Sequence, residues 1–230
     1  MKLTVVSLGP GDPSLVTIQG MLALVESSAI IVPTKNQESL EASRTYDILV
    51  RLAEYTKNIF QVPLVLKEKK LIPCYNPMRY YKEDWVRQTD IIIDALRNEN
   101  NVCYVTLGDA GIFSTAYFLL DIIKENYPGL YQSSHVLPGI TSFSLASAKI
   151  KKPLCLGSTS LEILPQSGNA GEKTTVYMRP IKGKMKIPEK SHDVYTFSKL
   201  CFEGEHIKKG FPEEDCGYLT IMIDFAHKAK

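Results

Sequence analysis

The chain has 230 residues and nearly balanced charge, with 27 basic and 25 acidic side chains. The net charge of +2 gives no electrostatic reason to expect a nucleic-acid partner, which would favour a concentrated basic face. No run of about 18 apolar residues occurs, so we expect no membrane-spanning helix. The length allows one domain, or two of roughly 110 to 120 residues.

Short apolar runs alternate with helical patterns through the first half of the chain. Each run ends at glycine or proline, as a buried strand does at the start of a turn. The expected strands cover residues 3–8, 29–32 and 102–107. One helix is expected to begin at Ser14, and three more are expected to cover residues 39–55, 82–98 and 114–125. Strands separated by helices of this length predict a parallel or mostly parallel sheet with both faces covered.

The pattern changes after residue 129, where short β-type runs and turns predominate. Thr141 is expected to cap a helix that runs through residue 147. The other runs are residues 134–137, 161–164, 174–178, 194–198 and 218–223. We therefore predict two α/β domains, residues 1–112 and residues 113–230, the second with a mixed sheet and a ligand cleft between the two.

The cysteines and histidines carry no metal-binding pattern. The 5 cysteines are an odd number without a CxxC pair, and the 4 histidines are scattered. The apolar run at the N-terminus is too short for a signal sequence and stops at Gly9. These features predict a reduced, cytoplasmic protein without a zinc site.

Three turns share one design, in which an apolar strand is followed by glycine with proline or aspartate and then by a helix. They are Gly9-Pro10-Gly11-Asp12-Pro13, Gly108-Asp109-Ala110-Gly111 and Pro138-Gly139-Ile140-Thr141. In an open α/β sheet, ligands bind beyond the carboxyl ends of the strands, where glycines allow close approach of the backbone. The chain has neither GxGxxG nor GxxxxGK[ST], which argues against a nucleotide held by its phosphates.

These turns carry a resemblance to a known family. The segments "SLGPGDPSLVT", "TLGDAGIFSTAYFLL" and "LPGITSFSLASAKIKKPL" resemble the three motifs of the tetrapyrrole methylases, which use S-adenosylmethionine to methylate porphyrinoids on the way to cobalamin and sirohaem. The chain looks most like the precorrin-2/cobalt-factor II C(20)-methyltransferases. Most relatives in that branch have proline where this chain has Ala110, so we expect a more flexible loop here.

Other functions stay open at this point. The C(17)-methyltransferases share Gly-Asp-Ala-Gly but continue with a Tyr-Gly-Met type sequence where this chain has Phe113-Ser114-Thr115. A methylase of the same fold acting on diphthamide or ribosomal RNA would show a different second motif. A non-catalytic corrinoid-binding protein would lack a site for the sulfonium donor, and a nucleotide-binding regulator would need one of the missing phosphate motifs.

The resemblance implies a binding site for S-adenosylmethionine and its product S-adenosylhomocysteine, in a protein that forms a homodimer. The implied cofactor-binding residues are Pro10, Gly108, Asp109, Ile112, Thr141, Ser142, Met178, Cys201 and Thr220. Asp109 is the candidate catalytic base, although a role in holding its own loop has the stronger claim. The tetrapyrrole substrate carries eight carboxylates, so Arg44, Arg79 and Lys82 are the candidate substrate-binding residues.

Overall fold

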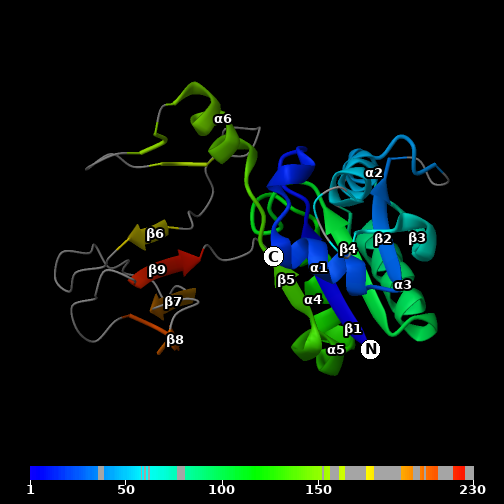
Figure 1. Ribbon diagram of the computed structural model, residues 1–230. Coiled ribbons are helices and arrows are strands. Elements are labelled where there is room, and N and C mark those ends of the chain that lie inside the picture. Colours follow the sequence, from blue (N-terminus) through cyan, green and yellow to red (C-terminus); the bar gives the residue numbers. More distant parts are fainter. Residues whose placement is uncertain are drawn as a thin grey trace. The chain divides into compact units, whose positions relative to one another are not determined.

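The computed structural model describes most of the chain (Figure 1). The described residues are 1–35, 39–57, 59, 61, 63–76, 81–151, 153–155, 161–163, 175–178, 193–198, 203–204, 206–211 and 220–225. The chain divides into two compact units, Met1–Leu161 and Glu162–Lys230. None of the described helices is long and apolar enough to cross a membrane.

The first unit is built on a five-stranded sheet. Its strands, in the order β3-β2-β4-β1-β5, all pair in parallel. They are β1 (Lys2–Ser7), β2 (Ala29–Thr34), β3 (Lys70–Tyr75), β4 (Asn101–Thr106) and β5 (His135–Leu137). The register aligns Ser7 with Thr106 and Val6 with Leu137, so β4, β1 and β5 end close to one level. The expected parallel sheet is confirmed.

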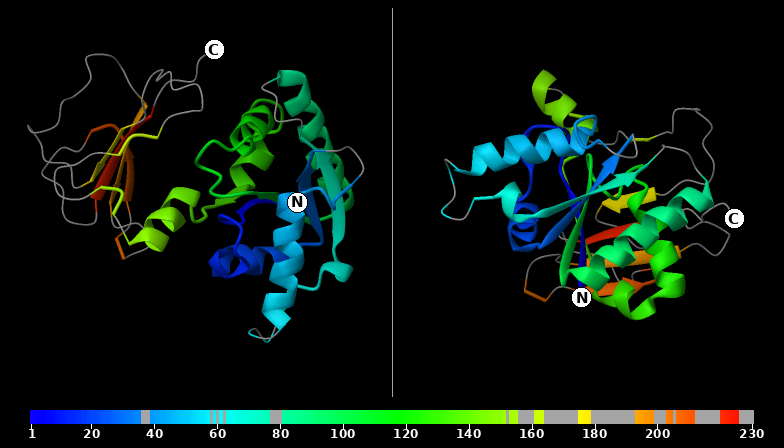
Figure 2. Two further views of the ribbon diagram at one scale, coloured as in Figure 1. Left: turned by 90° about the horizontal axis from the view of Figure 1, so that it is seen from above. Right: turned by 90° about the vertical axis from the view of Figure 1, so that its right-hand side faces the viewer.

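Helices cover both faces of this sheet (Figure 2). The helices packed on it are α1 (Ile18–Glu26), α2 (Arg44–Lys57), α3 (Lys82–Asn98), α4 (Ala116–Asn126) and α5 (Pro128–Ser133), with short 3-10 turns η1 (Pro13–Leu15) and η2 (Leu66–Glu68). Helix α6 (Ser142–Ile150) follows β5 and supplies no described residue to either core. The neighbours Ile30 and Ile31 of β2 illustrate the arrangement, because successive strand side chains point to opposite faces. Ile31 packs in the core with α3 and α4, whereas Ile30 packs in the core with α1 and α2.

Strand β3 is the element that the sequence pattern does not predict. Pro73 interrupts its apolar run, and proline cannot donate a hydrogen bond to a neighbouring strand. The sheet tolerates Pro73 because β3 pairs only with β2 and lies at the sheet edge. The short helix α5 is a second element beyond the expected set.

The division into units differs from the expected boundary between residues 112 and 113. Strand β5 pairs with β1, and Leu119 and Ile123 of α4 are buried in the core of the first unit. A boundary at residue 112 would separate β5 and α4 from the sheet that they complete. The structure therefore keeps residues 113–161 with the first unit.

The second unit contains a four-stranded sheet in the order β6-β9-β7-β8. Its strands are β6 (Thr175–Met178), β7 (Asp193–Ser198), β8 (His206–Lys209) and β9 (Thr220–Phe225). Every described pairing is antiparallel, so the expectation of a mixed sheet is wrong for these strands. Residues 161–163, expected to begin a strand, have no regular secondary structure.

Candidate functional site

The three glycine turns meet at one edge of the parallel sheet. They follow β4, β1 and β5, which are adjacent in the sheet order. Because all three strands run in the same direction, the turns that leave their carboxyl ends must lie side by side. We call these turns the glycine loops: loop 1 is residues 8–13, loop 2 is residues 107–113 and loop 3 is residues 138–141.

A pair of backbone hydrogen bonds joins loop 1 to loop 2. The amide of Gly9 donates to the carbonyl of Gly108 over 3.1 Å, and the amide of Gly108 donates to the carbonyl of Gly9 over 2.8 Å. Both residues have positive φ angles, 70° for Gly9 and 71° for Gly108, where residues with a Cβ atom are strained. Glycine at both positions therefore allows this reciprocal contact.

Loop 3 joins the same cluster through Gly139. A Cβ atom at this position would lie only 2.6 Å from the carbonyl oxygen of Gly108 and 2.6 Å from Cβ of Ser7. Non-bonded carbon atoms favour separations of about 3.5–4.0 Å, so a side chain at position 139 would force the loops apart. Gly139 therefore allows the backbone of loop 3 to lie directly against loop 2.

Two hydrogen bonds hold the turn at Asp109 in place. Oδ1 of Asp109 accepts a hydrogen bond from the amide of Gly111 over 2.9 Å. The amide of Ala110, a residue that is only 1% exposed, donates to Oγ of the fully buried Ser7 over 2.9 Å. Proline at position 110 could not make this bond, so the substitution that predicted a more flexible loop instead supplies an anchor. The sequence analysis missed Ser7, whose signal is a hydroxyl at the end of an otherwise apolar strand.

Ser114 and Thr115, the residues that follow Phe113, hold the end of loop 2 in place. Oγ of Ser114 lies 3.1 Å from Oγ1 of Thr106, and it accepts a hydrogen bond from the amide of Ala116. Oγ1 of Thr115 accepts a hydrogen bond from Nδ2 of Asn76, which follows β3. Ser114 and Thr115 thus tie the start of α4 to the ends of two strands.

Phe113 is an unusual residue in loop 2. Its φ angle is 49°, which is costly for a bulky side chain, and the side chain is exposed. Nearby, burial raises the pKa of Tyr117, and the negative charge of Asp109 raises it further. The phenol of Tyr117 therefore stays protonated to a higher pH than an exposed tyrosine does, and it can donate a hydrogen bond.

Loop 1 carries a second carboxylate, Asp12, which caps the turn η1. Its Oδ1 accepts hydrogen bonds from both the hydroxyl and the amide of Ser14, and these bonds lower the pKa of the carboxyl group. Arg51 of α2 donates to the carbonyl of Gly11 over 2.7 Å. Asp12 and Arg51 therefore stabilise the shape of loop 1.

The structure brings together most of the residues expected to bind the cofactor. Six of them lie on the glycine loops or at the start of α6: Pro10, Gly108, Asp109, Ile112, Thr141 and Ser142. Thr141 caps α6, since its Oγ1 accepts a hydrogen bond from the amide of Ser144. The other three belong to the second unit. Met178 and Thr220 lie on the paired strands β6 and β9, where Met178 pairs with Ile221, and Cys201 lies outside the described residues.

The candidate substrate-binding residues are more scattered. Arg44 and Lys82 are exposed at the first residues of α2 and α3, and these helices pack on opposite faces of the sheet. Arg79 lies outside the described residues. No described contact joins Arg44 to Lys82.

In open α/β sheets, ligands bind beyond the carboxyl ends of the strands, which is where this chain places its three glycine loops. The model of one family, the Tetrapyrrole (Corrin/Porphyrin) Methylases, matches residues 2–210. The chain belongs to this family. The expected family and the expected α/β class are thereby confirmed.

Individual relatives share about a quarter of their aligned residues with this chain. The chain is 28% identical over 165 residues to the cobalt-precorrin-2 C(20)-methyltransferase of Salmonella typhimurium, an alignment that covers 71% of this chain and 62% of that enzyme. It is 25% identical over 192 residues to the cobalt-precorrin-4 C(11)-methyltransferase of Methanocaldococcus jannaschii, covering 82% of this chain and 56% of that enzyme. The chain thus spans less than two thirds of the length of these relatives.

A solved structure shares the fold. The cobalamin synthesis related protein CobF of Corynebacterium diphtheriae aligns with a TM-score of 0.51 and 13% sequence identity. The alignment covers 97% of this chain and 98% of that protein. At this identity, the likeness concerns the fold alone.

The contact of Gly139 with loop 2 predicts that alanine at position 139 destabilises the protein more than alanine at position 129 does. We expect Gly139→Ala to lower the free energy of unfolding by about 1–3 kcal/mol, as overpacking does, because the new methyl group meets the backbone of Gly108. Gly129→Ala is the matched control. Among the described residues, no atom outside the chain neighbours and backbone of helix α5 lies within 4 Å of a Cβ atom at position 129, so this change should be neutral or stabilising by up to about 1 kcal/mol. Urea denaturation of both variants checks the prediction, and equal stabilities would contradict it.

The bond between Ala110 and Ser7 predicts coupled substitutions. Ala110→Pro removes the donor and leaves the buried Ser7 hydroxyl without it, which should cost about 1–3 kcal/mol. The entropy that proline removes from the unfolded chain offsets only about 0.4–1 kcal/mol. Ser7→Ala removes the acceptor, so the double variant should lose less stability than the sum of the two single losses. Denaturation of all four proteins measures this, and strictly additive losses would refute the anchor.

Proposed function

We propose that this protein binds S-adenosylmethionine at the glycine loops and methylates precorrin-2 or cobalt-factor II at the C(20) meso carbon, a step of cobalamin biosynthesis. The observation that carries the proposal is the meeting of loops 1, 2 and 3 at one sheet edge, where Gly108 contacts both Gly9 and Gly139. The resemblance in the three motifs and the match to a C(20)-methyltransferase favour this branch of the family.

The residues of the loops have the chemistry that this methyl donor needs. The donor carries a cationic sulfonium, an ammonium group and a carboxylate. Asp109, which is partly exposed, offers a carboxylate toward the cations. Thr141 and Ser142 offer a hydroxyl group each, and α6 begins at Ser142 with amides suited to a carboxylate. We therefore assign the amino-acid end of the donor to loops 2 and 3.

The catalytic task of the protein is chiefly alignment. When bound, S-adenosylmethionine supplies an already activated methyl group, and the electron-rich macrocycle supplies the carbon nucleophile. Loops held together by direct backbone contacts can fix the position of one reactant against the other. Orientation of this kind is worth roughly 7–11 kcal/mol in well-matched systems. We assign this orienting role to the loops that the pairing of Gly9 with Gly108 joins.

One proton must leave the methylated carbon, and Asp109 is the carboxylate of loop 2 that can accept it. Its Oδ1 already accepts the amide hydrogen of Gly111, which favours a role in shaping the loop. Asp109→Asn keeps an acceptor at that atom but removes the base. We expect this variant to keep its melting temperature and to lose less than tenfold in kcat. A loss of 100-fold or more in a folded variant would instead identify Asp109 as the general base, since such groups contribute about 10²–10⁴.

The proposal is tested in two stages with the purified protein. In the first, titration calorimetry with S-adenosylhomocysteine should give micromolar affinity or better, and an absence of binding would refute the donor site. In the second, the protein is incubated with labelled S-adenosylmethionine and either cobalt-factor II or the metal-free precorrin-2. We expect one methyl group to be added at C(20).

The position of the label separates the alternatives. Label at C-17 or C-11 would assign the protein to another branch of the tetrapyrrole methylases. Binding of the macrocycle without binding of S-adenosylhomocysteine would favour a non-catalytic corrinoid-binding protein. The metal-free and cobalt-containing substrates distinguish the two forms of the pathway.

A further inference from the structure

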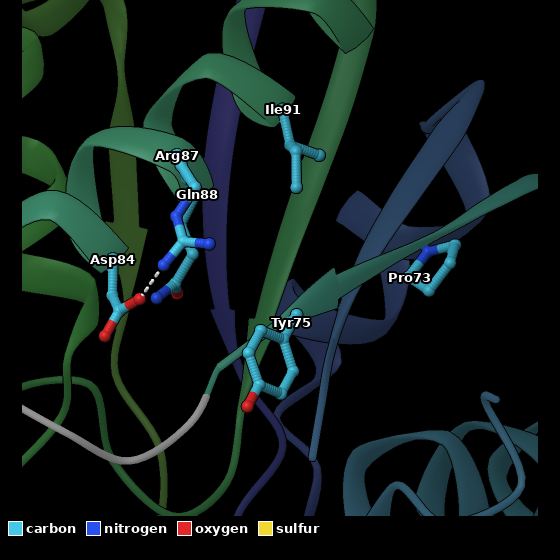
Figure 3. A pocket seen from close by; sticks show the side chains of 6 residues that line it. All are labelled: Pro73, Tyr75, Asp84, Arg87, Gln88 and Ile91. Atoms are coloured by element: carbon cyan, nitrogen blue, oxygen red, sulfur yellow. Dashed lines mark hydrogen bonds and ion pairs between the residues drawn. The ribbon is translucent and has the colours of Figure 1, made fainter. Parts of the chain in front are cut away.

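A pocket lies beside the edge strand of the parallel sheet (Figure 3). Its volume is about 220 Å³, and it lies between β3 and the first half of α3. The lining residues are Pro73, Tyr75, Asp84, Arg87, Gln88 and Ile91. None of them is among the candidate cofactor- and substrate-binding residues named above.

An ion pair forms one wall of the pocket. Arg87 donates through one terminal nitrogen to Oδ1 of Asp84, three residues earlier on α3. The Asp84 side chain is only 10% exposed, whereas the Arg87 side chain is 63% exposed. A guanidinium group has five N–H donors, so Arg87 keeps donors available for a ligand while Asp84 fixes its position. Planar donor pairs of this kind recognise carboxylates.

Gln88 gives the second, independent sign of a ligand. The residue is 1% exposed, and neither Nε2 nor Oε1 of its side chain has a hydrogen-bond partner among the residues that the structure describes. Leaving such groups unpaired in a protein interior is destabilising. Figure 3 shows the amide beside the Arg87 guanidinium, on the side of α3 that faces Tyr75. An amide in this setting is suited to donate to a group that enters the pocket.

The place of the pocket in the sheet relates it to the proposed reaction. Tyr75 is the last residue of β3, so the pocket opens near the edge of the sheet at which the glycine loops lie. Strand β3 is two positions from β4, which corresponds to about 10 Å at the usual strand spacing. A macrocycle of four pyrrole-derived rings, with its acid side chains, exceeds that span.

We propose that this pocket receives one carboxylate side chain of the tetrapyrrole, bound by Arg87 and by the amide of Gln88, with the Tyr75 ring as an apolar wall. The inference rests on the proposed function. Because Asp84 balances the charge of Arg87, the pocket adds orientation more than net attraction. Loss of Arg87 should therefore weaken binding of the macrocycle about tenfold, the effect of one charge-assisted hydrogen bond.

The only tryptophan of the chain, Trp85, offers a direct measurement. It follows Asp84 on α3 and stacks on Phe118 with ring centroids 4.0 Å apart. Cobalt-factor II absorbs light, so its binding should quench Trp85 fluorescence. We expect Arg87→Met to raise the Kd for cobalt-factor II, and the KM in the methylation assay, about tenfold, with little change in kcat and none in the affinity for S-adenosylhomocysteine.

Arg97→Met is the matched control. Arg97 lies on the same helix and pairs with Asp94 three residues earlier over 2.9 Å, but both side chains are about two-thirds exposed and neither lines the pocket. This change should leave the Kd for cobalt-factor II unaltered. Equal affinities of the Arg87→Met and Arg97→Met proteins for cobalt-factor II would overturn the proposal.

Gln88→Leu separates a binding role from a purely structural one. Leucine removes the two unpaired polar atoms, so the unliganded variant should melt at a higher temperature, while its Kd for cobalt-factor II should rise several-fold. Greater stability with unchanged affinity would overturn the role of Gln88.

If the unaltered protein binds S-adenosylhomocysteine but not cobalt-factor II, the pocket assignment and the proposed substrate fail, and the donor site stands. If it methylates cobalt-factor II and both variants match it, the pocket alone fails.

Discussion

The reciprocal hydrogen bonds between Gly9 and Gly108 are the constraint on which the site depends. They join the ends of β1 and β4 directly, without a side chain between them. Both glycines have positive φ angles, and Gly139 of loop 3 lies against the same carbonyl group. The three loops therefore form one backbone surface, in which Gly108 contacts both Gly9 and Gly139. Close contact between the loop backbones accounts for the glycines that follow β1, β4 and β5 more fully than turn formation alone does.

The buried interactions around this surface hold it in register. Ser7 is the last residue of β1, and its hydroxyl accepts the amide hydrogen of Ala110. Ser114 and Thr115 link loop 2 to β4 and to the end of β3. Two cores, one on each face of the sheet, support the strands behind the loops. The site thus combines a rigid base with exposed residues such as Phe113 at its rim.

Much of the first unit could be predicted from the sequence because its strands are buried on both faces and end at glycine or proline. The range expected for α3 agrees with the helix observed, Lys82–Asn98, since its apolar residues recur at helical spacing. Strand β3 was missed because Pro73 argues against a strand unless the strand is known to lie at an edge, which is a tertiary fact. The domain division was missed for a similar reason: the pairing of β5 with β1 joins segments more than a hundred residues apart.

The candidate site also contains residues that could be predicted from the sequence and residues that could not. Pro10, Gly108, Asp109 and Thr141 could be grouped from sequence because parallel strands bring their carboxyl ends to one edge. The anchor formed by Ser7 could not, since a serine in a strand has many possible partners. Gln88 looks like an ordinary polar residue of a helix, and only the packing of α3 beside β3 reveals that its amide is buried without a hydrogen-bond partner in the described part of the chain.

The central claim is that the three glycine loops together form the binding site for the methyl donor. Hydrogen–deuterium exchange with and without saturating S-adenosylhomocysteine tests it most directly. The account predicts that, within the first unit, protection increases in peptides covering residues 8–13, 107–113 and 138–144, and changes little in the peptide covering α5. Protection confined to one loop, or absent from all three while the ligand is bound, would contradict it.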